Sequence, residues 1–225
     1  MSISINIPVY NEEFNIEDTY NNLIKAIKIV KLNDYEIIFI NDGSNDNSLK
    51  IIKKISRKNN KVIIINNKKN LGLAISLLKA FKKSKKKFVW WLPSDNNVGK
   101  IEIAKVISDY SKTDFILTKH IMSRTLFRKF VSHGYTILLN VIFLLNIPYY
   151  NGLFLIKKEM IKKVKIKSKS QFWMGEMVIN LLKLSNNYEI RTIKLNERKK
   201  GTSNIFNFKQ LYLTIMDLIN FRMGI

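Results

Sequence analysis

Three short polar segments of this chain each follow directly on a run of apolar residues. Asp95 comes just after the apolar stretch 88–92, and the polar segments 8–13 and 41–44 follow two earlier apolar stretches. In an open parallel sheet, ligands bind outside the carboxyl ends of the strands, where a carboxylate can hold a divalent cation that also takes phosphate oxygens as ligands. Each segment alone is typical of a turn or a helix cap. Together they favour a site for a polar ligand and a metal ion.

The elements that would position these segments alternate between strands and helices, because apolar residues recur first at strand spacing and then at helix spacing. The strands are expected at 2–7, 35–40, 62–65, 88–92 and 114–118. The helices that separate them are expected at 16–30, 49–57, 72–81 and 101–110. This order is typical of βαβ units, so we expect an α/β fold, Rossmann-like, with a mostly parallel sheet and helices on both faces.

The pattern changes in the second half of the chain. Helices are expected there at 124–146, 175–184 and 205–222, and strands at 151–156 and 188–195. A basic segment with one glycine, 197–204, separates the last strand from the last helix. No repeat or linker divides the chain, so we expect a single domain over residues 1–225.

The composition limits the class of protein. The absence of cysteine excludes disulfides and thiol catalysis and fits a reducing compartment. The start of the chain lacks the features of a signal peptide. No apolar run reaches the roughly 18 residues of a membrane-spanning helix, so we expect a cytoplasmic protein.

The net charge of +22, from 39 basic and 17 acidic residues, predicts attraction to polyanions. Abundant lysine throughout the chain offers a second explanation, a general compositional bias, so the charge alone does not identify a partner. A nucleic-acid-binding protein would not need acidic residues at strand ends, and we expect no nucleic acid partner. A nicotinamide-dependent dehydrogenase should carry G-x-G-x-x-G after its first strand, where this chain has Pro-Val-Tyr-Asn-Glu-Glu.

Four segments carry a resemblance to a known family. Ile7–Glu13, Ile40–Asp46, Asn70–Gly72 and Leu92–Asp95 resemble family 2 glycosyltransferases of the GT-A fold, in the branch of the dolichyl-phosphate mannose synthases. The resemblance implies a metal-dependent hexosyltransferase with a nucleotide-sugar-binding part at 1–118. It also implies an acceptor part with a C-terminal amphipathic helix at 119–225.

Carried over by position, the resemblance assigns donor-binding residues. They are Pro8, Tyr10, Glu12, Asp42, Gly72, Ser94, Gly201 and Ser203, with Asp42 on the base or ribose. Asp95 matches the second acid of the family's Asp-x-Asp motif, which implies Mg²⁺ or Mn²⁺ as cofactor. Pro93 stands at the place of the first acid, so one carboxylate is missing. Arg198 begins a segment that matches the family's Arg-x-x-Gly-x-Ser loop over the donor phosphates, although Asn204 replaces the usual lysine.

The acceptor side has two interpretations. Arg128 and Ser132 match an Arg-x-x-x-Ser that meets a lipid phosphate, which implies a polyprenyl phosphate (dolichyl or undecaprenyl) at the cytoplasmic face of the membrane. A sugar hydroxyl, as in cell-surface polysaccharide synthesis, would instead require a general base. Glu176 is the candidate by family position, or it is an acid that simply favours the first turn of a helix. A further interpretation is that the chain is a catalytically inactive relative of these enzymes that binds partners, because Pro93 replaces the first acid of the metal motif.

The last expected helix is apolar on a wide face, with a narrow polar stripe of Asn207, Gln210, Thr214 and Asp217. Such a helix could lie on anionic lipid as a peripheral membrane contact. It could equally pack against the core or against a second subunit.

Overall fold

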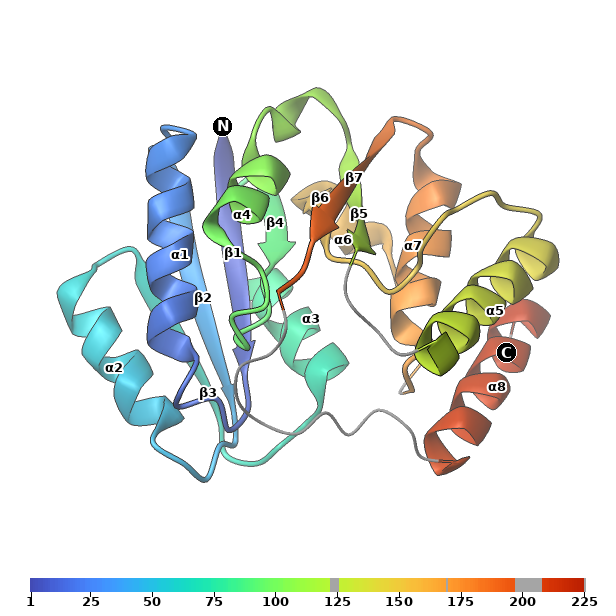
Figure 1. The fold of residues 1–225 in the computed structure, drawn as a ribbon, viewed down its shortest axis with the longest axis horizontal. Coiled ribbons are helices and arrows are strands. Elements are labelled where there is room, and N and C mark those ends of the chain that lie inside the picture. Colours follow the sequence, from blue (N-terminus) through green and yellow to red (C-terminus); the bar gives the residue numbers. More distant parts are fainter. Residues whose placement is uncertain (122–125, 169, 197–207, 225) are drawn as a thin grey trace.

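The computed structural model describes residues 1–121, 126–168, 170–196 and 208–224. In these residues a seven-stranded sheet has the strand order β3-β2-β1-β4-β6-β5-β7 (Figure 1). Its strands pair in parallel except β6, which runs antiparallel to both β4 and β5. The expected α/β fold with a mostly parallel sheet is confirmed.

The strands are β1 (Ser2–Val9), β2 (Asp34–Asp42), β3 (Val62–Asn67), β4 (Phe88–Trp91), β5 (Phe115–Ile121), β6 (Phe154–Lys157) and β7 (Tyr188–Lys194). The α-helices are α1 (Ile16–Ile29), α2 (Ser48–Lys58), α3 (Leu73–Lys83), α4 (Lys100–Ile107), α5 (Leu126–Phe143), α6 (Lys158–Lys163), α7 (Trp173–Leu184) and α8 (Phe208–Met223), with a 3-10 turn, η1 (Tyr110–Lys112).

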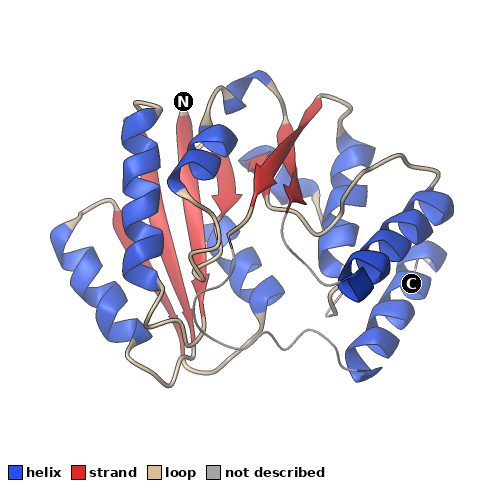
Figure 2. Cartoon of the chain, viewed as in Figure 1, coloured by secondary structure: helices blue, strands red, loops and turns tan. Residues whose placement is uncertain are grey.

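Helices cover both faces of the sheet, as Figure 2 shows. Neighbouring residues of a strand point to opposite faces, and in β2 both sets are apolar and buried. Phe39 lies under α1, where its ring contacts Tyr20 at a centroid distance of 6.5 Å. Ile38 and Ile40 instead form a cluster with Ala80 of α3. A strand with apolar residues on both sides is thus explained by helices on both sides.

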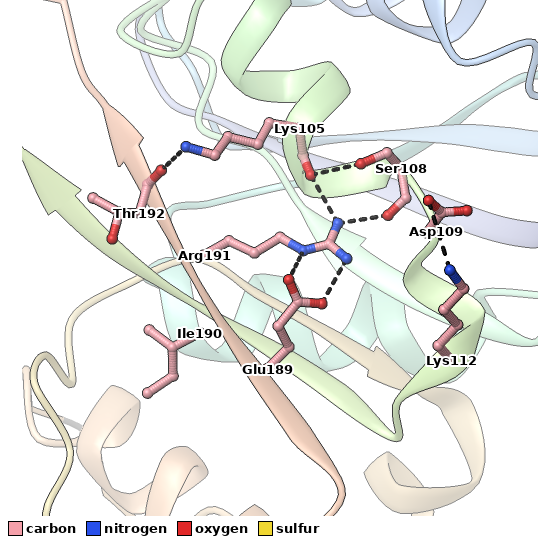
Figure 3. Close-up of a pocket in the computed structure, with 8 residues that line it drawn as sticks. All are labelled: Lys105, Ser108, Asp109, Lys112, Glu189, Ile190, Arg191 and Thr192. Atoms are coloured by element: carbon pink, nitrogen blue, oxygen red, sulfur yellow. Dashed lines mark hydrogen bonds and ion pairs between the residues drawn. The ribbon is translucent and has the colours of Figure 1, made fainter.

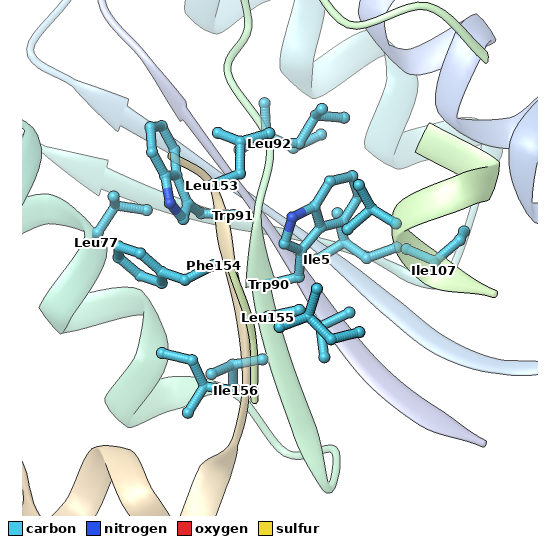
Figure 4. Close-up of a cluster of buried hydrophobic side chains, with 14 of the residues drawn as sticks. Ile5, Leu77, Trp90, Trp91, Leu92, Ile107, Leu153, Phe154, Leu155 and Ile156 are labelled. Atoms are coloured by element: carbon cyan, nitrogen blue, oxygen red, sulfur yellow. The ribbon is translucent and has the colours of Figure 1, made fainter. Parts of the chain in front are cut away.

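The two tryptophans of β4 centre the core on opposite faces (Figure 4). Trp90 lies beside Ile5 and Ile107, whereas Trp91 lies on the side of Leu77 and Phe154. Trp91 and Phe154 have ring centroids 6.0 Å apart. These large buried side chains fix β4 in the middle of the sheet, and so fix the position of the residues that follow it.

Helices α5, α7 and α8 form a second layer at one end of the molecule (Figure 1). Phe221 of α8 joins them, because its ring lies 5.7 Å from that of Phe143 and 5.5 Å from that of Phe172. Gly175 lets α5 approach α7, since a Cβ there would lie 3.0 Å from a methyl carbon of Leu139. Across the described part of the chain, no helix combines the length and the apolar character needed to cross a membrane.

The structure differs from the sequence-based prediction at a few boundaries. Helix α6 was not predicted, because its six residues include three lysines and show no clear apolar period. Helix α5 ends at Phe143 rather than 146, since Leu144 adopts a positive φ of 52°. Strand β6 begins only at Phe154, after a turn in which Gly152 lies directly against β5.

The contact of Gly152 with β5 generates a prediction about stability. A Cβ on Gly152 would lie 1.9 Å from the carbonyl oxygen of Thr118, and the backbone must move to admit it. Gly152→Ala should therefore lower the free energy of unfolding by about 2 kcal/mol or more, measured by urea denaturation. Gly134 of α5 is the matched control, because beyond its own helix backbone and its two chain neighbours no atom lies within 4 Å of its ideal Cβ position. Gly134→Ala should be neutral or stabilising by up to about 1 kcal/mol, and an equal loss in both variants would contradict the explanation.

Candidate active site

The polar segments after β1, β2 and β4 meet at one edge of the sheet, as predicted. Strand β1 lies between β2 and β4, and all three run in the same direction. The hydroxyl of Ser94 donates to the carbonyl of Pro8 at 2.8 Å, and the carbonyl of Ser94 accepts a hydrogen bond from Thr19 at 3.0 Å. The segment that carries Asp95 is therefore tied to the end of β1 and to α1.

The loops after β1 and β2 hold each other through reciprocal hydrogen bonds. The backbone amide of Asn11 donates to Ser44 Oγ at 3.1 Å, and that of Asn45 donates to Asn11 Oδ1 at 2.9 Å. Further along, the amide of Glu13 donates to Asp46 Oδ2 at 3.0 Å. Burial raises the pKa of Asp46, but hydrogen bonds from Ser48 and from backbone amides outweigh this effect and hold the pKa below its ordinary value. The two loops form one preorganised surface.

Asp42 at the end of β2 is buried, with 4% of its surface exposed. Its Oδ1 accepts hydrogen bonds from Asn67 at 2.9 Å, Ser76 at 2.7 Å and the amide of Leu71 at 3.0 Å, and its Oδ2 accepts one from the amide of Gly72 at 2.9 Å. A carboxylate has about four acceptor sites, so these bonds occupy it. This geometry favours a role for Asp42 in positioning the 70–72 loop over the direct contact with base or ribose that the resemblance implies.

The residues that hold Asp42 include two that sequence reasoning missed, Asn67 and Ser76. Strand β3 ends in Asn66-Asn67 and pairs with the end of β2 through the register Asp42↔Asn67. A fourth polar strand end therefore lies at the same edge. Its signal was present in the sequence, because two asparagines follow the apolar residues Val62–Ile65. Asparagine is common in turns of every kind, so this signal alone does not distinguish a site from a turn.

Asp95 is half-buried just beyond β4. Its Oδ1 accepts a hydrogen bond from the amide of Asn97 at 3.3 Å, and its Oδ2 accepts one from Asn97 Nδ2 at 3.1 Å. Asn97 Oδ1 is buried and has no hydrogen-bond partner within the described structure. This set of oxygen atoms fits a hard cation such as Mg²⁺ or Mn²⁺ that also takes ligands from a phosphate and water. No cluster of three or more acidic or histidine ligands occurs among residues that the structure describes.

The remaining donor-side residues fall into two groups. Tyr10 is exposed, Pro8 and Glu12 are half-buried, and all three lie at or just after the end of β1. Glu12 Oε2 accepts a hydrogen bond from Asn15 at 2.7 Å. Arg198, Gly201 and Ser203 lie outside the described residues, so their roles stay sequence-based predictions. Asn196, which precedes them, donates its amide to the carbonyl of Asn97 at 2.8 Å, so the chain leaves β7 beside the Asp95 segment.

Arg128 and Ser132 lie on the same side of α5 as buried Leu139, because residues four and seven apart share a helix face. Arg128 is exposed and Ser132 is half-buried. The opposite side of the helix carries Phe130 and Val141, which are 77% and 67% exposed. The start of α5 lies toward the same side of the molecule as the strand arrowheads in Figure 1. The predicted pair is therefore on the protein-facing side of an unusually apolar surface helix.

Glu176 is almost completely buried, with 1% of its surface exposed. Its Oε1 accepts a hydrogen bond from the amide of Lys167, and its Oε2 accepts one from the amide of Ser168, both at 2.9 Å. A general base must reach the proton that it removes, whereas this carboxylate is turned toward the 167–168 backbone. The geometry favours the structural alternative for Glu176, an acid in the first turn of α7 that fixes the preceding segment.

A pocket of about 470 Å³ lies away from this edge, beside the start of β7 and the end of α4 (Figure 3). Arg191 dominates it, but its guanidinium pairs with Glu189 at 2.7 Å and donates to carbonyls at the end of α4. The hydrogen bond from Arg191 holds the pKa of Glu189 below its ordinary value. Because these polar groups serve to cap α4, the pocket is a weaker candidate than the carboxyl edge of the sheet.

The buried position of Glu176 generates a prediction that separates its two roles. Glu176→Ala removes the acceptor for two backbone amides, one buried and one part-buried, and hydrogen bonds to a charged group contribute about 1.5–3 kcal/mol each. The free energy of unfolding should fall by about 3 kcal/mol or more, measured by urea denaturation. Glu159→Ala is the control, because Glu159 is exposed in the first turn of α6 and should change stability by less than about 0.5 kcal/mol. A Glu176→Gln variant of unchanged stability that loses only sugar transfer would make Glu176 the base.

Comparisons with known proteins agree with this geometry. The family model for glycosyl transferase family 2 matches residues 4–165. The uncharacterized glycosyltransferase YkcC of Bacillus subtilis is 36% identical over 74 residues, which are 33% of this chain and 23% of that protein. The undecaprenyl-phosphate 4-deoxy-4-formamido-L-arabinose transferase of Proteus mirabilis is 41% identical over 51 residues, 23% of this chain and 15% of that protein. The matches thus span less than a quarter of these curated relatives.

Solved structures share the fold at low sequence identity. Glucosyl-3-phosphoglycerate synthase from Mycobacterium tuberculosis, in complex with Mn²⁺, UDP and phosphoglyceric acid, aligns with a TM-score of 0.71 and 15% identity over 100% of this chain and 79% of that one. S. aureus TarS in complex with UDP-GlcNAc aligns with a TM-score of 0.63 and 19% identity over 98% and 67%. These neighbours establish the GT-A fold. The match of the family model over most of the chain shows that it belongs to glycosyl transferase family 2.

Proposed function

We propose that this chain transfers a sugar from a nucleotide-sugar donor, bound at the carboxyl edge of β1, β2 and β4, to a polyprenyl phosphate. The donor-binding part of this proposal rests on one observation, which is that the polar segments after these strands converge at one edge of the sheet. Ser94 is hydrogen-bonded to Pro8, and Asn11 to Ser44, so the segments form one rigid surface before any ligand arrives. The solved neighbours were crystallised with UDP-GlcNAc or with UDP and a divalent cation, which supports this class of donor.

Each part of the edge has its own task in the proposal. Tyr10 and Glu12 line the nucleotide pocket, and Asp42 holds Gly72 and the 70–72 loop in place for the donor. Asp95, with the oxygen of Asn97 beside it, would hold Mg²⁺ or Mn²⁺, which when bound neutralises charge on the leaving nucleoside diphosphate. Arg198, with the amides of the loop that contains Gly201 and Ser203, would stabilise the same charge. The anchoring of Asn196 on Asn97 supports the placement of this loop.

The metal site generates a prediction about binding. Asp95 is the one carboxylate at the end of β4, because Pro93 occupies the other motif position, so metal and donor should bind cooperatively. Asp95→Asn should abolish the Mn²⁺-dependent part of nucleoside diphosphate binding, measured by calorimetry, while the melting temperature without ligand stays unchanged. Asp109→Asn removes an exposed acid beside η1 and serves as the control. Unchanged Mn²⁺-dependent binding in Asp95→Asn would remove Asp95 from the site.

The acceptor half rests on α5 and on the burial of Glu176. A phosphate oxygen is already anionic at neutral pH and needs no general base, which fits a Glu176 carboxylate that is occupied by backbone amides. Arg128 and Ser132 would bind the phosphate of the acceptor. The partial likeness to a transferase named for undecaprenyl phosphate supports the same class of acceptor, and with it the mannose synthase-like branch of the family.

The outer faces of α5 and α8 support a peripheral position at the cytoplasmic face of a membrane. On α5 these faces carry Phe130 and Val141, and on α8 they carry Tyr212, Ile219 and Met223, all well exposed. The sequence predicted a polar stripe on the last helix. The structure turns part of that stripe inward, because Thr214 and Asp217 are half-buried and Asp217 Oδ2 accepts a hydrogen bond from the amide of Ser170 at 2.9 Å. Interfacial helices bury such an apolar face in the headgroup region.

The acceptor proposal predicts a selective loss in one variant. Arg128→Ala removes a charged hydrogen bond to phosphate, so transfer into lipid should fall about ten- to a hundred-fold, while donor binding stays unchanged. The measurement is transfer of radiolabelled sugar from a panel of nucleotide sugars into organic-extractable lipid. Lys129→Ala removes the same charge from the next position of α5 and should retain most of the activity. Transfer to a soluble hydroxyl by the wild type, with no lipid-linked product, would contradict a lipid phosphate acceptor.

A further inference from the structure

A second cavity, which the proposed reaction does not use, lies between α7, the end of α8 and the segment that precedes α7. Its volume is about 380 Å³. Four lysines line it, Lys163, Lys165, Lys167 and Lys183, and all four are exposed. We call this cavity the lysine pocket. Within the described structure none of the four forms an ion pair. Glu176 is the one acid among the residues that line the pocket, and its carboxylate is bonded to backbone amides, so positive charge exceeds negative charge around the cavity.

The segment that carries three of these lysines is fixed in place. The carboxylate of Glu176 accepts the backbone amides of Lys167 and Ser168, and Asn180 Nδ2 donates to the carbonyl of Lys165 at 3.3 Å. Val164 and Ile166 are half-buried and alternate with the exposed lysines. The alternation turns the charged side chains outward along one side of the segment. A buried acid thus serves to hold several cations close together at the surface.

The rest of the lining is mixed, because it includes the polar residues Glu176 and Asn180 as well as three apolar side chains. Val164, Leu184 and Phe221 line it, and the ammonium group of Lys183 lies 5.1 Å from the centre of the Phe221 ring. Phe221 belongs to α8, whose opposite face carries the exposed Ile219 and Met223. Lysines beside apolar side chains, at the end of a helix with an apolar outer face, suit a ligand with a phosphate and an adjoining hydrocarbon part.

We propose that the lysine pocket binds the headgroup phosphate of anionic phospholipids and thereby fixes the chain on a bilayer. The proposal rests on the peripheral membrane position in the proposed function, and it adds the lipid class and the residues that recognise it. A second copy of the chain is a poor occupant, because a symmetric contact would place the four lysines against their own copies. The charge of the lysines is instead complementary to an anionic leaflet, where each lysine near the surface strengthens binding about five-fold.

The test is sedimentation of the full chain with vesicles of phosphatidylcholine alone and with added phosphatidylglycerol. We expect binding only to the anionic vesicles, and weaker binding as salt screens the charges. The combined variant Lys165→Gln, Lys167→Gln and Lys183→Gln should bind about a hundred-fold more weakly. The matched control is Lys50→Gln, Lys53→Gln and Lys58→Gln on α2, which lies at the opposite end of the molecule (Figure 1). The control variant has the same net charge as the lysine-pocket variant, and it should bind the anionic vesicles as the wild type does.

Several outcomes would overturn the proposal. They are equal losses in the two variants, wild-type binding by the lysine-pocket variant, and equal binding to neutral and anionic vesicles. Pocket-dependent binding of inorganic phosphate without vesicle binding would identify a free anion as the ligand. Loss of self-association in ultracentrifugation, with vesicle binding unchanged, would identify a second copy. Sugar transfer to a water-soluble short-chain polyprenyl phosphate without vesicles should be unaffected by the lysine-pocket variant. Failure of that transfer in the wild type would count against the proposed function alone.

Discussion

The parallel pairing of β1 with β2 on one side and β4 on the other is the constraint on which the rest of the structure depends. The register pairs Val9 with Asn41 and Asn6 with Trp91, so the three strands end close together and their loops leave from one edge. Loops crowded in this way must satisfy their backbone polar groups. They do so through each other, as the bonds of Asn11 with Ser44 and Asn45 show. A strand order that separated these ends would leave the same residues as unconnected turns.

A different constraint shapes the other end of the molecule. Phe221 joins α8 to Phe143 and Phe172, and Gly175 admits α5 close to α7. These contacts use one face of each helix. Helices α5 and α8 are also apolar on the face turned away from the contacts, where Phe130 of α5 is 77% exposed. Contiguous exposed apolar surface is a feature of interaction sites in folded proteins. The chain thus has a polar edge at the ends of the parallel strands and apolar outer faces on α5 and α8, and the proposed function assigns the first to a charged donor and the second to lipid.

Most of the fold could be predicted from the sequence, because β2 and β4 are continuously apolar and the helices between the strands are strongly periodic. The meeting of Asp95 with the ends of β1 and β2 followed from parallel pairing alone. Individual side-chain roles could not be predicted in the same way. Asp42 and Glu176 each resembled a functional acid, and only three-dimensional packing shows that backbone amides occupy their carboxylates. The direction in which the apolar face of α8 points also depends on tertiary contacts that helical periodicity does not specify.

The central claim is that a nucleoside diphosphate and a divalent cation bind together at the carboxyl edge of β1, β2 and β4. Paramagnetic broadening of amide NMR signals by Mn²⁺ tests it most directly, because broadening depends steeply on distance from the ion. The account predicts that signals of Asn11, Ser44 and Asn97 broaden when Mn²⁺ is added with UDP and stay sharp with Mn²⁺ alone. The amide of Lys112, at the opposite edge of the sheet, should be unaffected in both cases. Broadening at Lys112 instead, or none at the carboxyl edge with any nucleoside diphosphate, would contradict the claim.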